Sequence, residues 1–192
     1  MTRIMRDSTT PAAIPVAGTQ LAAGYVDGSW DDFAAIQARF PGIAHVSIDV
    51  NGSHPEADVR DWENGDKAGS LEQWVIDHNN HAGHKDARVY CNRSTIPEVR
   101  QLTGSQILGK DYWLWVATLD GTKILPDMFG VSAVQDKGAN LTGANYDESI
   151  VYDDTWKSSA PPAPSPAPQR DYVVVSLPDG ASFKAVSGMV LK

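Results

Sequence analysis

Two acidic side chains, Asp61 and Glu63, stand two residues apart in a segment that has the pattern of a β-strand. Residues two apart in a strand share a face, and these two would lie about 6.6 Å apart along it. Gly65 follows at once, so we expect the pair at the carboxyl end of its strand, where α/β barrels build active sites. Two acids in one pocket of low dielectric acquire different pKa values, so that one stays protonated while the other is ionised. Cleavage of a glycosidic bond requires this division of roles.

The same pattern has a structural interpretation, because an aspartate followed two residues later by a glutamate is a short and common sequence. In that interpretation the acids belong to a solvated end of the strand and pair with Arg60 or Lys67. The spacing alone leaves both interpretations open.

Short apolar runs alternate with helical patterns over most of the chain. Strands are expected at residues 21–26, 43–50, 57–63, 88–91 and 112–118, with weaker ones at 131–135 and 149–152. Helices are expected at residues 29–40, 71–82 and 96–102. This alternation predicts an α/β fold with a mostly parallel sheet or barrel. Residues 51–56 are too few for a crossover helix, which leaves open whether the strands on either side are parallel neighbours.

The two ends of the chain differ from this pattern and set the expected domain boundaries. Residues 1–17 mix Pro, Thr and Ala without a period, and are predicted to form an extended N-terminal arm before a barrel at residues 18–157. Residues 158–169 (SSAPPAPSPAPQ) are a Pro-rich linker that can extend to about 37 Å. Residues 170–192 are predicted to form a C-terminal β-hairpin that is too small to be stable alone and therefore docks on a partner or oligomerises.

The composition excludes several classes of function. A formal net charge of −8 over 192 residues argues against binding to nucleic acid or to an anionic membrane. Cys91 is the only cysteine, so no internal disulfide is possible. We expect no signal peptide and no membrane span, because no stretch approaches the roughly 20 apolar residues that cross a bilayer. Glycine-rich phosphate-binding patterns are absent from the sequence, and no cofactor is expected.

Three histidines, His78, His81 and His84, raise the question of a metal site. A helix brings residues three apart together but carries the sixth residue round the cylinder, and Gly83 ends the predicted helix before His84. The sequence therefore favours a solvated helix end, and no metal is expected.

Four motifs in order resemble the family 25 glycoside hydrolases. Residues 24–30 (GYVDGSW), with Asp27, are similar to that family's first-strand motif, and residues 61–63 (DWE) to its paired-acid motif. Residues 112–117 (YWLWVA) resemble a later strand, while Gln135 and residues 146–149 (YDES) resemble the closing segment. The closest likeness is to a glycoside-hydrolase-like domain common in actinobacteria and their phages.

The resemblance implies a TIM-like (β/α) barrel, here small or trimmed because the chain is short. It also implies hydrolysis of the β-1,4 bond between N-acetylmuramic acid and N-acetylglucosamine in bacterial cell-wall glycan. Glu63 would be the general acid and Asp61 its partner. Asp27 and Asp147 would be the flanking acids, and Gln135 would contact substrate.

Aromatic rings are natural platforms for sugars, and four of them are candidates for substrate contact. These are Trp62, Tyr90, Trp113 and Trp115. Core packing is the other explanation for each of them, and the sequence does not decide between the two.

Two functions from different classes follow. The first is a muramidase-like enzyme, and the second is a catalytically inactive structural or decoration protein of a phage head or tail that keeps the hydrolase fold. Both ends of the chain favour a virion-associated protein, since an arm and a hairpin suit contacts with other virion proteins. The expected location is the virion, or the host cytoplasm before release.

Overall fold

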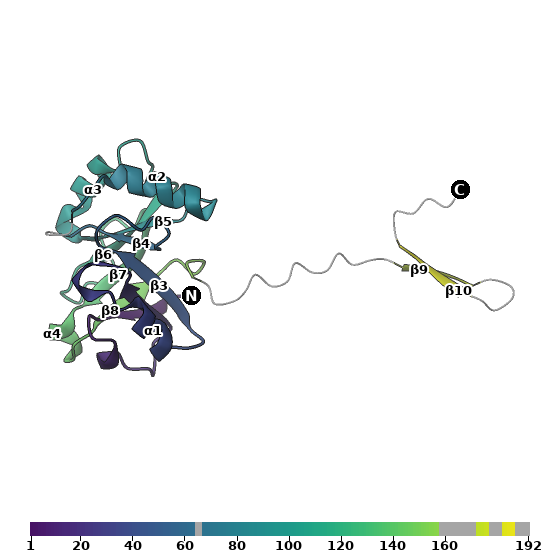
Figure 1. Cartoon of the computed structure of the whole chain (residues 1–192), viewed down its shortest axis with the longest axis horizontal. Helices are drawn as coiled ribbons and strands as arrows, with labels where there is room; N and C mark the ends of the chain where they lie inside the picture. The colour runs from purple at the N-terminus through teal and green to yellow at the C-terminus, as the bar shows by residue number, and fades with distance from the viewer. Residues whose placement is uncertain (64–66, 158–171, 177–181, 187–192) are drawn as a thin grey trace. The chain divides into compact units, whose positions relative to one another are not determined.

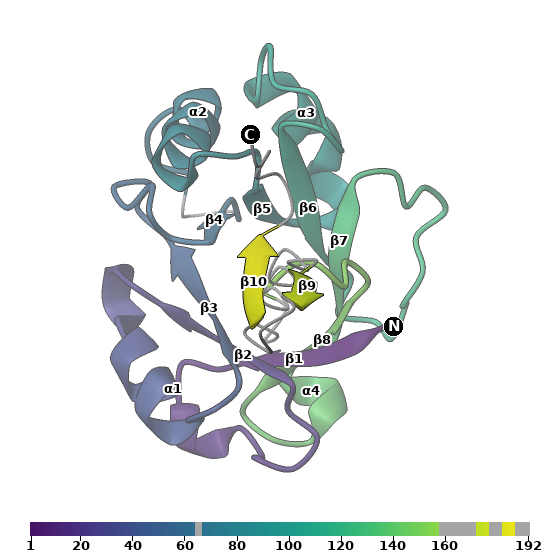
Figure 2. The ribbon, with the colours of Figure 1, turned by 90° about the vertical axis from the view of Figure 1, so that its right-hand side faces the viewer.

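Eight strands, β1 to β8, form a closed barrel in sequence order, and β8 pairs with β1 to close it (Figure 2). The computed structural model describes residues 1–63, 67–157, 172–176 and 182–186. The barrel strands are β1 (Arg3–Asp7), β2 (Leu21–Tyr25), β3 (Ala44–Asp49), β4 (Val59–Asp61), β5 (Ala87–Asn92), β6 (Tyr112–Ala117), β7 (Val131–Lys137) and β8 (Asp147–Val151). Successive strands from β1 to β7 pair in parallel, whereas β8 runs antiparallel to both β7 and β1. The predicted TIM-like α/β barrel is thus confirmed.

The first strand corrects the prediction of an N-terminal arm. β1 pairs with β2 on one side and with β8 on the other, and Met5 is fully buried inside the barrel. The mixed composition without a period predicted an arm, but both arginines of the strand are engaged. Arg6 forms an ion pair with Glu148 at 2.8 Å, and Arg3 donates to the carbonyl oxygen of Asp153 at 2.8 Å. Residues 3–7 are therefore part of the domain.

Four helices pack on the outside of the strands (Figure 1): α1 (Phe33–Arg39), α2 (Leu71–Ala82), α3 (Ile96–Leu102) and the short α4 (Ala139–Thr142). The side chain of Ser70 caps α2 by accepting from the Gln73 amide, and Gly83 ends it with a φ of 72°. α1 lies close against β2, because a Cβ at Gly24 would come within 2.7 Å of Ile36. None of the helices in the described residues is long and apolar enough to cross a membrane.

The link between β3 and β4 settles the question that the sequence left open. The two strands are parallel neighbours, with Ile48 opposite Val59 and Asp49 opposite Arg60. Residues 50–58, all described, connect them without a helix. The barrel is therefore trimmed on this side, and an open groove lies there on its outer surface.

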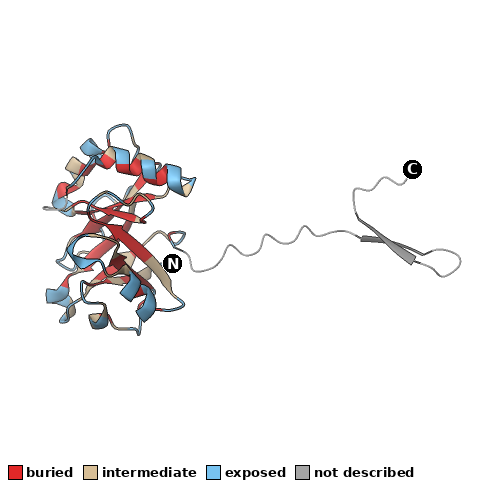
Figure 3. Cartoon of the chain, in the orientation of Figure 1, coloured by how far each residue is buried: buried red, intermediate tan, exposed pale blue. Residues whose placement is uncertain are grey.

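Buried side chains form one core inside the barrel, an outer core beside α2 and α3, and a smaller outer cluster that includes Ile36 of α1. Figure 3 shows the strands buried over most of their length. The inner core includes Met5, Val59 and Trp115. The outer core packs Trp62, Trp74 and other residues between the strands and the helices α2 and α3. Alternate residues of one strand thus enter different cores, and only the inward set can reach a site inside the barrel.

The C-terminal segment forms a separate unit, Ser159–Lys192, which is described by itself. Its strands β9 (Tyr172–Ser176) and β10 (Ser182–Val186) pair antiparallel in a two-stranded sheet. The predicted Pro-rich linker, residues 158–169, lies outside the described residues.

Candidate active site

The mouth of the barrel, defined here as the end where β1 to β7 finish and the antiparallel β8 begins, gathers acidic residues. Asp7 is the last residue of β1, and Asp61 is the last residue of β4. Asp147 is the first residue of β8 and lies directly opposite Asp7 in the strand register. Strands that are far apart in the sequence therefore present carboxyl groups at the same end of the barrel.

Asp61 and Glu63 act electrostatically on the same groups. Asp61 is 4% exposed and follows Val59 at a spacing of two on the inner side of β4, while Trp62 between the two acids packs outward. Burial raises the pKa of Tyr25 and of Tyr90, and Asp61 and Glu63 both raise these values further. The two acids are therefore gathered at the mouth together with both tyrosines.

Asp7 is a residue of the mouth that the sequence reasoning missed. Burial raises the pKa of its carboxyl well above the usual value, and the nearby charges of Asp147, Asp61, Asp32 and Glu63 raise it further. A protonated carboxyl can donate a hydrogen bond, which an ionised one cannot. The sequence feature that could have identified Asp7 is the turn-forming run of residues 8–11 (STTP) directly after it, which is typical of a strand end.

Asp147 also lies at the mouth, and its carboxyl group accepts a hydrogen bond from Gln135. Burial raises the pKa of its carboxyl, while hydrogen bonds from the Ala139 backbone and from Gln135 oppose this shift. The Gln135 side-chain amide donates to Asp147 Oδ2 at 2.8 Å, and Gln135 is only 2% exposed. Gln135 therefore orients an acid of the mouth, rather than offering an open surface for substrate as predicted.

Asp27 does not occupy the position that the sequence suggested. It follows β2, not the first strand, and its carboxylate accepts hydrogen bonds from the backbone amides of Val50 at 2.7 Å and Asn51 at 3.0 Å. Residues 24–30 belong to the second strand and the turn after it, because residues 3–7, which the sequence predicts to be an arm, form the first strand. The acid that ends the first strand is Asp7, and Asp27 fastens the loop after β3.

Of the four predicted aromatic platforms, only Tyr90 lies at the mouth. Its ring packs edge-on against Trp115 with 4.7 Å between the centroids. Trp115, its register partner on β6, is 1% exposed and donates its indole N–H to Ser149 Oγ at 3.0 Å. Trp62 is 4% exposed in the outer core. The prediction that Trp62 and Trp115 contact sugar is therefore wrong, because both rings are core.

Trp113 lies at the opposite end of the barrel. It is the second residue of β6 and is opposite Arg88, the second residue of β5, whereas the mouth is formed by the last residues of these strands. Parallel strands place residues near their starts at the end away from the mouth. Trp113 therefore cannot contact a substrate bound at the mouth.

Arg60 fixes the backbone around the paired acids. Its guanidinium is fully buried and donates to the carbonyl oxygens of Asp49 at 3.0 Å, Asp61 at 2.5 Å and Ala68 at 2.9 Å, and also to that of Val50. These carbonyls belong to the end of β3, the end of β4 and the loop that follows it. One side chain thus ties the segment carrying Asp61 and Glu63 to the neighbouring strand.

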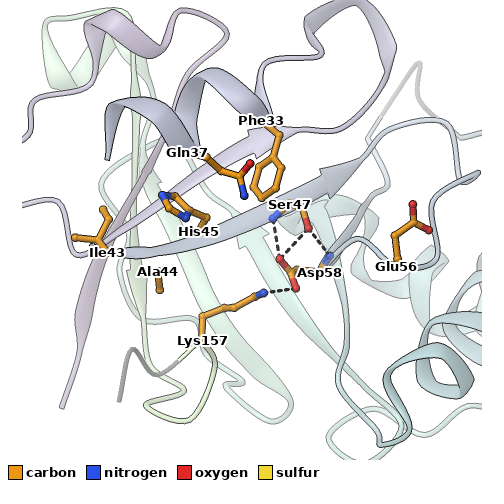
Figure 4. Close-up of a pocket in the computed structure, with 9 residues that line it drawn as sticks. All are labelled: Phe33, Gln37, Ile43, Ala44, His45, Ser47, Glu56, Asp58 and Lys157. Carbon is orange, nitrogen blue, oxygen red and sulfur yellow. Dashed lines mark hydrogen bonds and ion pairs between the residues drawn. The ribbon is translucent and has the colours of Figure 1, made fainter. Parts of the chain in front are cut away.

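Two depressions in the surface help to locate the site. One of about 190 Å³ lies at the mouth and is lined by Asp7, Ser8, Thr9, Tyr25, Ala139, Asn145, Tyr146 and Asp147. A larger one of about 460 Å³ lies outside the barrel, beside β3, where the crossover helix is missing (Figure 4). There Asp58 is bound by Ser47 and by Lys157, at 2.8 and 2.7 Å. The four gathered acids favour the mouth as the reactive site, in spite of its smaller volume.

The three histidines considered as metal ligands in the sequence are not arranged as a metal site. His78 is stacked on Trp74 with 5.2 Å between the ring centroids, and its Nδ1 is 2.9 Å from the Pro55 carbonyl oxygen. Within the described residues, no three His, Cys, Asp or Glu side chains are grouped so as to hold a metal ion.

No protein-family model matches the sequence, and no curated protein matches it. Solved structures do match. A family 25 glycosyl hydrolase from Bacillus anthracis is 12% identical, with a TM-score of 0.51 over 82% of this chain and 92% of that one. The bacterial lysozyme from Streptomyces coelicolor is 17% identical, with a TM-score of 0.52 over 82% of this chain and 95% of that one.

The modular autolysin LytC from Streptococcus pneumoniae, solved in complex with a synthetic peptidoglycan ligand, is 20% identical with a TM-score of 0.50. The match covers 79% of this chain and 47% of the autolysin, so the chain spans about half of that protein. Identities this low carry the fold and not the activity. Together with the closed barrel, they show that the chain has the fold of the family 25 glycosyl hydrolases.

Proposed function

We propose that this protein is a muramidase-like glycoside hydrolase whose substrate is bacterial cell-wall glycan. The observation that carries the proposal is the gathering of Asp7, Asp61, Glu63 and Asp147 at the mouth of a barrel with this fold. The bond cleaved is the β-1,4 linkage between N-acetylmuramic acid and N-acetylglucosamine, as the sequence resemblance implies.

The proposed mechanism divides the work among these acids. Glu63 protonates the glycosidic oxygen as its bond to the ring carbon breaks, and the ionised Asp61 stabilises the positive charge that develops on the sugar ring. A water molecule then bonds to that carbon, and the proton that the water loses replaces the one that Glu63 gave. Asp7, whose pKa is raised by burial, stays protonated and donates a hydrogen bond to the substrate. Asp147, oriented by Gln135, is the second flanking acid.

The raised pKa of Asp7 supports this division on physical grounds. Carboxyl groups gathered in a buried site cannot all ionise at once, because each charge makes the next ionisation more costly. A site with several acids and few cations therefore holds at least one proton near neutral pH. The mechanism needs a further proton on Glu63, and the same repulsion among the gathered carboxyl groups favours it.

The test is the solubilisation of purified peptidoglycan by the wild-type protein and by Glu63→Gln. General acid catalysis contributes about 10²- to 10⁴-fold, so we expect the variant to lose at least about 100-fold in rate. The matched control is Glu56→Gln, which makes the same chemical change at a side chain 53% exposed beside the outer groove. Equal rates for Glu63→Gln and wild type would exclude the general-acid role.

Association with a phage particle is a separate proposal, supported by the C-terminal unit. A two-stranded sheet is marginally stable alone, so β9 and β10 are suited to docking on a partner. The N-terminal argument no longer supports it, since β1 belongs to the barrel. The second candidate function is a decoration protein without turnover. In that case the C-terminal unit would attach the protein to the phage particle, and the mouth would bind glycan or have no ligand.

Ending the chain after Lys157 tests the attachment. We expect the truncated barrel to unfold within about 2 °C of the full chain's midpoint, because Met1–Ser158 forms a compact unit. Size-exclusion chromatography should show that the truncated protein no longer oligomerises, and co-sedimentation with phage particles should show that it no longer binds them. Normal assembly by the truncated protein would overturn the attachment proposal and leave the hydrolase proposal untouched.

A further inference from the structure

A second groove, of about 240 Å³, lies at the end of the barrel opposite the mouth. Its lining comes from the starts of β6 and β7, the loop before β7, and the segment after β8. Three of its lining residues are aromatic: Trp113, Phe129 and Tyr152. None of them takes part in the site at the mouth.

Phe129 is exposed and yet held in place. Its side chain is 66% exposed, although its backbone amide donates to Asp127 Oδ1 at 2.9 Å. The ring lies so close to Gly109 that a Cβ there would come within 3.0 Å of Phe129 Cζ. One exposed apolar side chain is ordinary on a protein surface, and Phe129 is informative because it lines the same groove as Trp113 and Tyr152.

The other two rings are fixed by different elements. The Arg88 guanidinium carbon lies 5.8 Å from the centroid of the Trp113 ring. The Tyr152 hydroxyl donates to the Lys123 carbonyl oxygen at 2.6 Å, which ties the segment after β8 to the loop before β7. The three rings are thus positioned before any ligand arrives, which reduces the entropy that binding costs.

The charge of the groove is balanced. Asp153 is its acidic residue, and Asp153 Oδ2 is 2.8 Å from the Arg88 guanidinium. The Ser132 hydroxyl, beside them, is buried and donates to the Leu114 carbonyl oxygen at 2.9 Å, so it adds no charge to the groove. Aromatic faces with balanced polar groups favour a neutral ligand with apolar and hydroxyl-bearing surfaces, which describes a sugar ring.

We propose that this groove is a second glycan-binding site, which holds an N-acetylhexosamine unit while the mouth holds another part of the substrate or none. Identifying wall glycan as the natural ligand rests on the proposed function, but binding needs no turnover. A second copy of this chain is a poorer fit, since a stable protein interface buries about 800 Å² per partner and this is a small depression.

The experiment is an NMR titration of ¹⁵N-labelled full-length Glu63→Gln protein with the N-acetylglucosamine tetrasaccharide. We expect saturable shifts of the Gly109 and Gly130 amides at the groove, independent of any shifts at Asp7 and Asp147 at the mouth. Absence of saturable shifts at the groove would overturn the proposal. Peptidoglycan solubilisation by the wild type reports the mouth separately, so failure of either site can be recognised.

Phe129→Ala is the informative variant, because an exposed ring can be removed with little effect on folding. We expect its affinity for the tetrasaccharide at the groove to fall about tenfold, with shifts at the mouth unchanged. Ile124→Ala is the matched control, since Ile124 is 69% exposed on the same loop and does not line the groove. Unchanged affinity in Phe129→Ala, or a change of oligomeric state without sugar binding, would refute the assignment.

Discussion

Arg60 is the side chain on which the geometry of the paired acids depends, and Arg60→Lys tests this. The arginine is fully buried and donates to four backbone carbonyls on three segments. A lysine keeps the charge, but its ammonium is a single point that cannot reach acceptors spread over the ends of β3 and β4 and the following loop. The charge is conserved, so the change isolates the hydrogen-bond geometry.

The expected loss is about 3–6 kcal/mol of unfolding free energy. Hydrogen bonds to a charged group contribute roughly 1.5–3 kcal/mol each, and we expect the lysine to leave about two of the four carbonyls without a donor. In a domain of this size the loss corresponds to a fall in the thermal midpoint of roughly 6–24 °C. Because Asp61 and Glu63 lie on the segment that Arg60 fastens, the rate of wall solubilisation at saturating substrate should also fall.

Urea unfolding followed by tryptophan fluorescence measures the change. The matched control is Arg93→Lys, at an arginine that is 50% exposed and pairs with Asp120 at 3.3 Å. An exposed pair of this kind contributes about 1 kcal/mol or less, so the control should stay close to wild type. A loss in Arg60→Lys no larger than in Arg93→Lys would refute the reasoning, because the hydrogen bonds that the lysine cannot make would then contribute nothing to stability.

Two further predictions concern the inside of the barrel. The pKa of Asp7 is raised in the folded state, so its contribution to stability is fully present below the unfolded value of about 3.9 and is lost as the pH rises through the folded pKa. Asp7→Asn removes this titration, so its unfolding free energy relative to wild type should increase between pH 4 and pH 8; an equal difference at both pH values would contradict the raised pKa. Trp156→Ala should destabilise the barrel by about 3–5 kcal/mol in urea unfolding, since the ring is 2% exposed and packs against Trp115 and the Arg88 guanidinium. A loss below 1 kcal/mol would show that Trp156 does not close the inner core.

Local features of the sequence were sufficient for several elements. The helix α2 was predictable because its signals lie within it, in the apolar stripe and in the terminal Gly83. The strand that carries Asp61 was predictable from its apolar alternation, although it ends at Asp61, two residues before Glu63. The parallel barrel followed from the alternation of strands and helices, and the structure confirms it.

Other features depend on residues far apart in the chain, so only the tertiary structure decided them. Residues 3–7 became a strand because β8 supplies their partners, with Asp7 opposite Asp147, about 140 positions away. Without that pairing, the sequence predicts residues 21–26 as the first strand. It therefore assigns the acid that ends the first strand to Asp27 instead of Asp7.

The same holds for the aromatic residues. The sequence established that Trp113 and Trp115 share one side of a strand, since they are two residues apart. Closure of the barrel decided that one is buried in the inner core and the other lines a groove at the far end. Periodicity specifies a side chain's direction relative to its own strand, but whether that direction leads to a core, a mouth or solvent depends on which strands surround it.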